Sequence, residues 1–299
     1  MLGKPGVVRE YPIVAGIDCV GYVRSSRSAL FREGDAVVLT GNKAGQYFDG
    51  GYAQRATAQA EWLVPLPANL SPSDAMVIGT AGVTAMMCVR HLEVAGELRP
   101  SHGPVLVTGA AGGLGQLAIA ILKARGFDVI ASSGRPALET HLRALGAGEV
   151  IGRLEPEQKP LAVQRWAGVV DSVGGATLAA AIAQTMYRGA VASTGVAGGG
   201  ELASTVFPFI LRGVRLLGVD STMPWNIAGY PADRERWECW QRERHALWEE
   251  LEATITPEAL QLVSSGTIAL EEVYGYSDKI LAGKVAGRLV VEIGLEDSS

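Results

Sequence analysis

Short apolar runs alternate with longer amphipathic segments through the middle of the chain, which predicts strands and helices in turn. The clearest unit begins with an apolar run at 105–107 and turns at a glycine cluster. It continues as a helical pattern over 116–125, with Leu117 and Ile121 on one face, and ends in a second apolar run at 129–131. This order predicts one strand–helix–strand unit.

The same alternation continues beyond this unit. The patterns predict helices over 137–145 and 177–186, and strands over 149–152, 167–173, 190–194 and 214–219. Strands and helices that alternate at these spacings are typical of a parallel, doubly wound sheet of the Rossmann type. We therefore predict an α/β dinucleotide-binding domain over residues 79–221.

The first seventy residues have a different pattern. Short β-like runs separated by glycine and proline turns predict strands over 20–23, 36–39, 52–55 and 62–66. Ser71-Pro72-Ser73-Asp74 is a helix start, and the helical pattern that follows over 75–94 is interrupted at Gly79 and Gly82. The N-terminal part is therefore a small β-rich unit.

The C-terminal part is predicted to belong to the same domain as this β-rich unit. An amphipathic helix is predicted over 233–251, and its broad apolar face is formed by Trp237, Trp240, Leu247, Trp248 and Leu251. A final strand over 289–293 is expected to return to the N-terminal β-rich unit. The predicted second domain thus combines residues 1–78 with 222–299.

Composition and charge narrow the classes of function. Apolar residues make up 48% of the 299 residues, enough for sizeable cores. The net charge of −5 provides no basic surface, so neither nucleic acid nor membrane is predicted as a partner. No charged-then-apolar leader opens the chain, and no uninterrupted apolar run is long enough to span a membrane. Three scattered cysteines favour a reducing compartment, so a cytoplasmic protein is expected.

The glycine cluster is the first candidate site. Gly112 and Gly115 occupy the second and third glycine positions of a G-x-G-x-x-G template, whose first position is Ala110. Such a turn lets a pyrophosphate approach the free N–H groups and the positive dipole end of the helix. With Gly113 and Leu114 between them, these residues are predicted to bind the phosphates of a dinucleotide.

The end of the second strand selects the cofactor. An NAD site places Asp or Glu there for the ribose hydroxyls, but this chain has Ser133-Gly134-Arg135 and no acid. Hydroxyls and a guanidinium suit a 2′-phosphate, so these three residues predict NADPH as cofactor. A solvated arginine at the start of the next helix is the simpler alternative. Loops after two later strands, 171–174 and 194–196 with Gly195, either line the nicotinamide ribose or are ordinary strand-end loops.

One N-terminal segment carries a family resemblance. Gly16-Ile17-Asp18-Cys19-Val20-Gly21-Tyr22-Val23 resembles the G-H-E-x-x-G-x-V segment of medium-chain dehydrogenases/reductases. Zinc-dependent members have a ligand histidine where this chain has Ile17. The resemblance, together with three cysteines and four histidines without ligand spacing, predicts no zinc site.

Further stretches resemble the zinc-independent acryloyl-CoA reductase branch, often called quinone oxidoreductases. They include Ile78 to Gly82, Phe207 to Arg212 and Val214 to Ser221. The resemblance implies a GroES-like catalytic domain, N-terminally incomplete in this chain, and a homodimer. It also implies that Val219 and Ser221 lie near the nicotinamide, and that Ser133-Gly134-Arg135 clamp the 2′-phosphate.

The resemblance implies reduction of an activated C=C bond. Hydride goes to the β-carbon of an enoyl-CoA, acryloyl-CoA above all, while negative charge develops on the thioester oxygen and a proton reaches the α-carbon. No catalytic residue is assigned from the sequence. Two alternatives remain open: an NADPH-dependent quinone or enone reductase, and an NADPH-binding protein without turnover.

Overall fold

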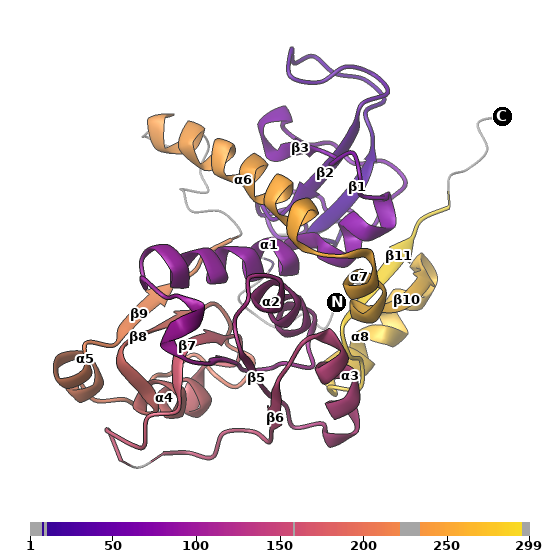
Figure 1. The fold of residues 1–299 in the computed structure, drawn as a ribbon. Helices are drawn as coiled ribbons and strands as arrows, with labels where there is room; N and C mark the ends of the chain where they lie inside the picture. Colours follow the sequence, from indigo (N-terminus) through magenta and orange to yellow (C-terminus); the bar gives the residue numbers. More distant parts are fainter. Residues whose placement is uncertain (1–7, 9–10, 158, 222–233, 295–299) are drawn as a thin grey trace. The chain divides into compact units, whose positions relative to one another are not determined.

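The computed structural model describes residues 8, 11–157, 159–221 and 234–294 (Figure 1). The chain divides into two compact units. Unit 1 comprises residues 1–83, 221–253 and 264–299, and unit 2 comprises residues 84–220 and 254–263. The predicted domain boundaries stay a prediction, since compactness alone does not define a functional domain.

Unit 2 contains a sheet of six parallel strands in the order β6-β5-β4-β7-β8-β9. The strands are β4 (Val105–Val107), β5 (Val129–Ser132), β6 (Glu149–Ile151), β7 (Trp166–Asp171), β8 (Thr185–Ser193) and β9 (Arg215–Gly218). From the centre of the sheet, β4, β5 and β6 follow one another toward one edge, and β7, β8 and β9 follow one another toward the other edge. This is a doubly wound topology. The predicted Rossmann-type sheet is confirmed.

Helices follow most of these strands. They are α2 (Gly113–Ala124), α3 (Glu139–Leu145), α4 (Gly175–Ala183) and α5 (Phe207–Arg212), with short 3-10 turns at Pro100–His102 and Pro136–Leu138. A further helix of unit 2, α7 (Pro257–Val263), does not directly follow a strand of this sheet. Leu117 and Ile121 of α2 are fully buried, as their helical spacing predicts. A second cluster joins Leu106, Trp166 and Ile182 between the sheet and α4.

Two neighbouring predicted elements of unit 2, the helix over 177–186 and the strand over 190–194, are wrong in their extent. The helical pattern over 177–186 was expected to continue past residue 183, but α4 ends at Ala183 and β8 begins at Thr185. Thr185 pairs with Trp166 of β7, so sheet pairing prevails over the local apolar pattern. Helices α5 and α7 were not predicted, although Thr256 followed by Pro257 is a helix start, and the Thr256 hydroxyl accepts a hydrogen bond from the Ala259 N–H (3.2 Å).

Unit 1 contains a small antiparallel sheet in the order β1-β2-β3. Its strands are β1 (Asp18–Tyr22), β2 (Ala36–Thr40) and β3 (Leu63–Pro65), with a 3-10 turn at Ala60–Trp62. The strand predicted over 52–55 is not formed. Gly51 and Tyr52 donate hydrogen bonds to Gly16 (3.1 Å) and Ala15 (2.9 Å), so this segment follows the irregular 14–16 loop rather than a ladder.

Helix α1 (Pro72–Val94) begins as predicted, with the Asp74 N–H donating to the Ser71 hydroxyl (3.1 Å). Its backbone breaks at Gly79, where φ is 47° and ψ is −157°, whereas the interruption predicted at Gly82 is absent. By length and composition α1 is the one described helix that could cross a membrane. However, 72% of its most apolar 18-residue stretch is buried inside the protein, as in the core helix of a globular domain. The length and composition of α1 therefore give little support for a membrane span.

The C-terminal elements of unit 1 are α6 (Arg234–Thr254), β10 (Ser264–Ala269), a 3-10 turn at Leu270–Glu272, α8 (Val273–Leu281) and β11 (Arg288–Glu292). The apolar face predicted for α6 is buried at Trp240, Leu247, Trp248 and Leu251, while the Trp237 side chain lies outside the described residues. The final strand pairs in parallel with β10, which the sequence did not predict.

Candidate functional site

The glycine turn between β4 and α2 is shaped by close backbone approaches. Gly109 has φ +59°, and a Cβ there would lie 2.5 Å from the Ser172 hydroxyl oxygen. A Cβ on Gly115 would lie 2.5 Å from the Gly109 carbonyl oxygen and 2.7 Å from the Ala110 Cα. Glycine is therefore required at both positions, one for the turn and one for packing of helix against strand.

The first turn of α2 leaves its donors open. Gly112 is the N-cap, has no side chain to cap the helix, and donates to the Gly109 carbonyl (2.9 Å). Within the described part of the chain, the N–H groups of Gly113, Leu114 and Gly115 have no acceptor. Three unpaired N–H groups at the positive end of a twelve-residue helix form a site suited to phosphate oxygens.

The loop after β5 lies next to this turn. The Arg135 guanidinium donates to the Ala111 carbonyl at 3.1 Å, so its charge is anchored at the glycine turn. The Arg135 N–H donates to the Ser133 hydroxyl at 3.1 Å. Partial burial lowers the pKa of Arg135 from its usual range, yet guanidinium remains charged at neutral pH. The structure thus brings Arg135 and the glycine turn together.

A buried carboxylate ties the ends of β4 and β7. Asp171 is fully buried and accepts hydrogen bonds from the Thr108 hydroxyl (2.7 Å) and the Gly174 N–H (2.8 Å). Burial raises the pKa of Asp171, and the hydrogen bonds partly oppose this. The Ser172 hydroxyl donates to the Thr108 carbonyl (3.1 Å). The order of the strands reverses between β4 and β7, and ligands in such folds bind at the carboxyl ends of the strands at this point. The hydrogen bonds of Asp171 and Ser172 hold these two strand ends together.

The remaining predicted cofactor contacts lie at neighbouring strand ends. Gly195 follows β8, and a Cβ there would lie 2.2 Å from the Ser172 carbonyl oxygen, so only glycine allows this approach. The Val219 N–H donates to the Ser193 carbonyl (3.0 Å), and its own carbonyl accepts from the Thr194 hydroxyl (3.1 Å). Ser221 is two residues further on and is the first residue of its segment in unit 1. The roles of Gly195, Val219 and Ser221 stay predictions.

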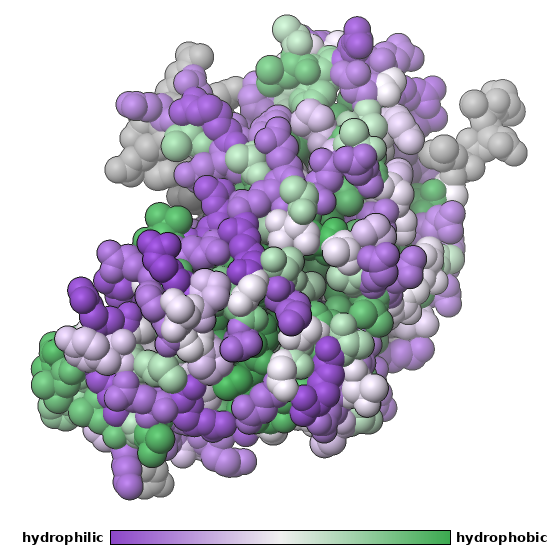
Figure 2. Space-filling model, in the orientation of Figure 1, coloured by the Kyte–Doolittle hydropathy of each residue, from purple (hydrophilic) through white to green (hydrophobic). Residues whose placement is uncertain are grey.

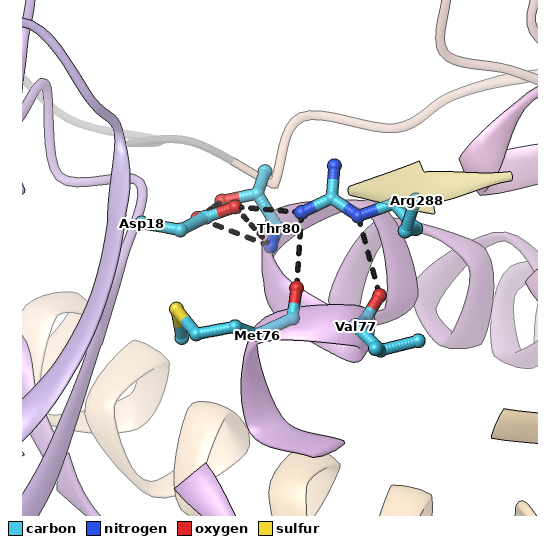
Figure 3. A network of polar contacts seen from close by, with 5 residues as sticks. All are labelled: Asp18, Met76, Val77, Thr80 and Arg288. Carbon is cyan, nitrogen blue, oxygen red and sulfur yellow. Dashed lines mark hydrogen bonds and ion pairs between the residues drawn. The ribbon is translucent and has the colours of Figure 1, made fainter. Parts of the chain in front are cut away.

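Asp18, in the Gly16-Ile17-Asp18 segment of unit 1, has a structural role. Asp18 accepts hydrogen bonds from the backbone N–H (3.1 Å) and the hydroxyl of Thr80, the first residue after the break in α1. Arg288 of β11 forms an ion pair with Asp18 (3.3 Å). Its guanidinium also donates to the carbonyls of Val77 (3.2 Å) and Met76 (3.3 Å), as Figure 3 shows.

These contacts satisfy both helix ends that the break creates. The carboxylate caps the new N-terminus, where N–H groups point outward, and the guanidinium caps the last carbonyls before Gly79. Sequence reasoning missed Arg288, since one arginine before an apolar run carries no signal of its partner. The interruption at Gly79 was the available signal, because a broken helix needs partners for its free ends.

Asp18 therefore has no free carboxylate for a metal, and Ile17 offers no ligand atom. In the described residues no three His, Cys, Asp or Glu side chains come together as a metal-binding group. Cys88 is buried, and desolvation raises its pKa to about 12, which opposes the thiolate form that binds zinc.

Comparisons with known proteins agree with this geometry. A family model described as "Zinc-binding dehydrogenase" matches residues 113–231. The chain is 46% identical over 293 residues to "Acrylyl-CoA reductase AcuI" of Ruegeria pomeroyi, with 96% of this chain and 83% of the relative covered. It is 43% identical over 298 residues to "Putative quinone oxidoreductase YhfP" of Bacillus subtilis, with 98% and 86% covered.

Solved structures show the same likeness. The yhdH oxidoreductase of Salmonella enterica in complex with NADP has a TM-score of 0.89 and 41% identity, covering 98% of this chain and 85% of that one. The structure of Bacillus subtilis yhfP contains NAD, with a TM-score of 0.86, 43% identity, and 96% and 83% covered. The chain therefore belongs to the medium-chain dehydrogenase/reductase family, in the branch that includes proteins named acrylyl-CoA reductase and quinone oxidoreductase.

Proposed function

We propose that this chain is an NADPH-dependent oxidoreductase that reduces the activated C=C bond of acryloyl-CoA to give propanoyl-CoA. One observation carries the cofactor assignment. Three N–H groups without acceptors at the start of α2 lie beside the turn to which Arg135 is bonded, and the end of β5 that precedes Arg135 holds no acidic residue. The name of the Ruegeria relative supports the substrate, and the NADP in the Salmonella structure supports the cofactor.

Different residues of the chain suit the different parts of NADPH. The turn Gly112–Gly115 would hold the pyrophosphate, and Ser133, Gly134 and Arg135 the 2′-phosphate. Gly195, Val219 and Ser221 would lie near the nicotinamide. When bound, NADPH supplies the hydride for a conjugate reduction. The chain's own contribution is to orient the cofactor through prearranged donors, since Arg135 is already tied to the Ala111 carbonyl.

Zinc, which the description of the matching family implies, does not suit these residues. Asp18 is occupied by Thr80 and Arg288, and Ile17 stands where zinc-dependent relatives have histidine. No step of the proposed reaction is assigned to a metal.

Quinones are the second candidate class of acceptor, favoured by the name of the Bacillus relative. Steady-state oxidation of NADPH with acryloyl-CoA and with a simple quinone separates the two activities. We expect kcat/KM to be higher for acryloyl-CoA. A higher value for the quinone would transfer the proposal to that class, and tight NADPH binding with neither acceptor turned over would favour a binding protein.

We further propose a cytoplasmic homodimer. Val206, Phe207, Ile210 and Leu211, on and next to α5, are exposed apolar side chains, and Figure 2 shows hydrophobic atoms gathered over this helix. Strand β9 is the last strand at one end of the described six-stranded sheet and pairs only with β8, so its other side is an open sheet edge near this patch. Light scattering should give a mass near twice the 31.4 kDa of the chain, and a monomer at micromolar concentration would refute the dimer.

A further inference from the structure

A second arginine lies at the same edge of the sheet as Arg135. Arg153 follows β6, which is the parallel neighbour of β5, so both strands end at this edge. The side chain is exposed, and within the described residues it has no hydrogen-bond or ion-pair partner. A guanidinium without a protein acceptor can bind a ligand without first breaking an internal bond.

The loops after β5 and β6 are tied together. The Ser133 N–H donates to the Ile151 carbonyl at 3.0 Å, and the Ser132 hydroxyl donates to the Gly152 carbonyl at 2.9 Å. Ser132 and Ser133, which donate these two bonds, are both buried. They hold the residue after Gly152 at a fixed place beside the loop that contains Arg135.

The Arg153 side chain covers the backbone of Gly134. A Cβ built on Gly134 would lie 2.3 Å from Nε and 3.0 Å from Cζ of Arg153. Gly134 does not have positive φ, so the turn itself tolerates another residue. Glycine at this position thus provides space, and the space is filled by the Arg153 guanidinium.

We propose that Arg153 is a specificity-determining residue, the second guanidinium of the subsite for the phosphate on the adenosine ribose of NADPH. This inference rests on the proposed cofactor. A phosphate monoester carries close to two negative charges at neutral pH, and paired arginines match both its charge and its oxygens. The segments Ser132–Arg135 and Ile151–Arg153 contain no carboxylate that would repel it.

The inference is tested with Arg153→Gln, Arg153→Lys and the control Arg99→Gln. Arg99 is an exposed arginine of unit 2 that precedes the amino end of β4, whereas the glycine turn follows its carboxyl end. Calorimetry on the full chain gives dissociation constants for NADPH, NADH, 2′,5′-ADP and 5′-AMP. We expect Arg153→Gln to weaken NADPH and 2′,5′-ADP about five- to tenfold, the scale of a partly exposed charge-assisted hydrogen bond.

Binding of NADH and 5′-AMP should change less than about twofold in Arg153→Gln. Arg153→Lys should recover part of the affinity for 2′,5′-ADP because it keeps the charge. Arg99→Gln should leave all four constants unchanged. Equal weakening of the ligands with and without a 2′-phosphate, or no weakening at all, would overturn the inference.

Gly134→Ala tests the geometry independently. The added methyl group would displace the Arg153 guanidinium, so it should weaken 2′,5′-ADP in the wild-type background and have no further effect in Arg153→Gln. An equal effect in both backgrounds would show that Arg153 is not the group displaced. If the wild-type protein prefers NADH to NADPH, the proposed cofactor itself is wrong. If the wild-type protein prefers NADPH and Arg153→Gln keeps the same preference, only the role of Arg153 is wrong.

Discussion

Replacement of Gly79 by alanine should destabilise unit 1 strongly, because two independent constraints require glycine there. The backbone angles of 47° and −157° lie in a region that residues with a side chain rarely adopt. A Cβ would also lie 2.6 Å from Oδ2 of Asp18 and 2.7 Å from Nη2 of Arg288. The variant must therefore strain the backbone and also disturb the pair of caps shown in Figure 3.

The two contributions can be summed. Holding a residue with a side chain in such a conformation costs about 1–3 kcal/mol. Displacing a charge-assisted hydrogen bond at a part-buried pair costs about 1.5–3 kcal/mol more. The free energy of unfolding should thus fall by about 2.5–6 kcal/mol, which is a large share of the stability of an ordinary domain.

Urea unfolding followed by tryptophan fluorescence measures this effect, since Trp62, Trp240 and Trp248 lie in unit 1. Gly275→Ala is the matched control. Gly275 is a glycine of unit 1 with helical conformation, and a Cβ there meets nothing within 4 Å, so alanine should stabilise α8 by about 0.5–1 kcal/mol. If Gly79→Ala behaves like this control, the break in α1 does not require glycine and the reasoning on the caps is wrong.

Three further predictions concern the cofactor, the metal and the thiols. Arg135→Ala should weaken NADPH binding by about 1.5–3 kcal/mol and leave NADH nearly unchanged, as measured by fluorescence titration; an equal loss for both cofactors would remove the 2′-phosphate assignment. Elemental analysis of the purified protein should find no stoichiometric zinc, and chelators should not change activity; one tightly held zinc per chain would contradict this. Iodoacetamide at neutral pH should label the exposed Cys239 first, because burial raises the pKa of Cys19 to about 11 and that of Cys88 to about 12. Peptide mass spectrometry reads the order of labelling, and Cys88 labelled as fast as Cys239 would refute it.

The sheet and the glycine turn between β4 and α2 could be predicted because their determinants are local. Gly109, Gly112 and Gly115 act within one turn of chain, and the central strands β4, β5 and β7 are buried along their whole length. Alternation along the sequence therefore led directly to the doubly wound order. The place of Arg135 beside this turn could be expected for the same reason, since its position after β5 follows from counting along one strand–helix–strand unit.

Other features depend on partners far away in sequence. Asp18 and Arg288 are 270 residues apart, and neither has a neighbour that announces the other. The segment over 52–55 has the composition of a strand, but hydrogen bonds to the 14–16 loop decide its path. Arg153 is recognised only once β5 and β6 are placed side by side. Contacts of this kind are set by tertiary packing, which local pattern does not record.

The proposed hydride transfer is tested most directly by the position of an isotope in the product. NADPH that carries deuterium at the transferred position is incubated with the protein and acryloyl-CoA in ordinary water, and the CoA product is examined by mass spectrometry and NMR. We expect propanoyl-CoA with one deuterium, located on the β-carbon, and a proton from water on the α-carbon. Absence of a reduced CoA product, or deuterium found at the α-carbon, would contradict conjugate reduction by this chain.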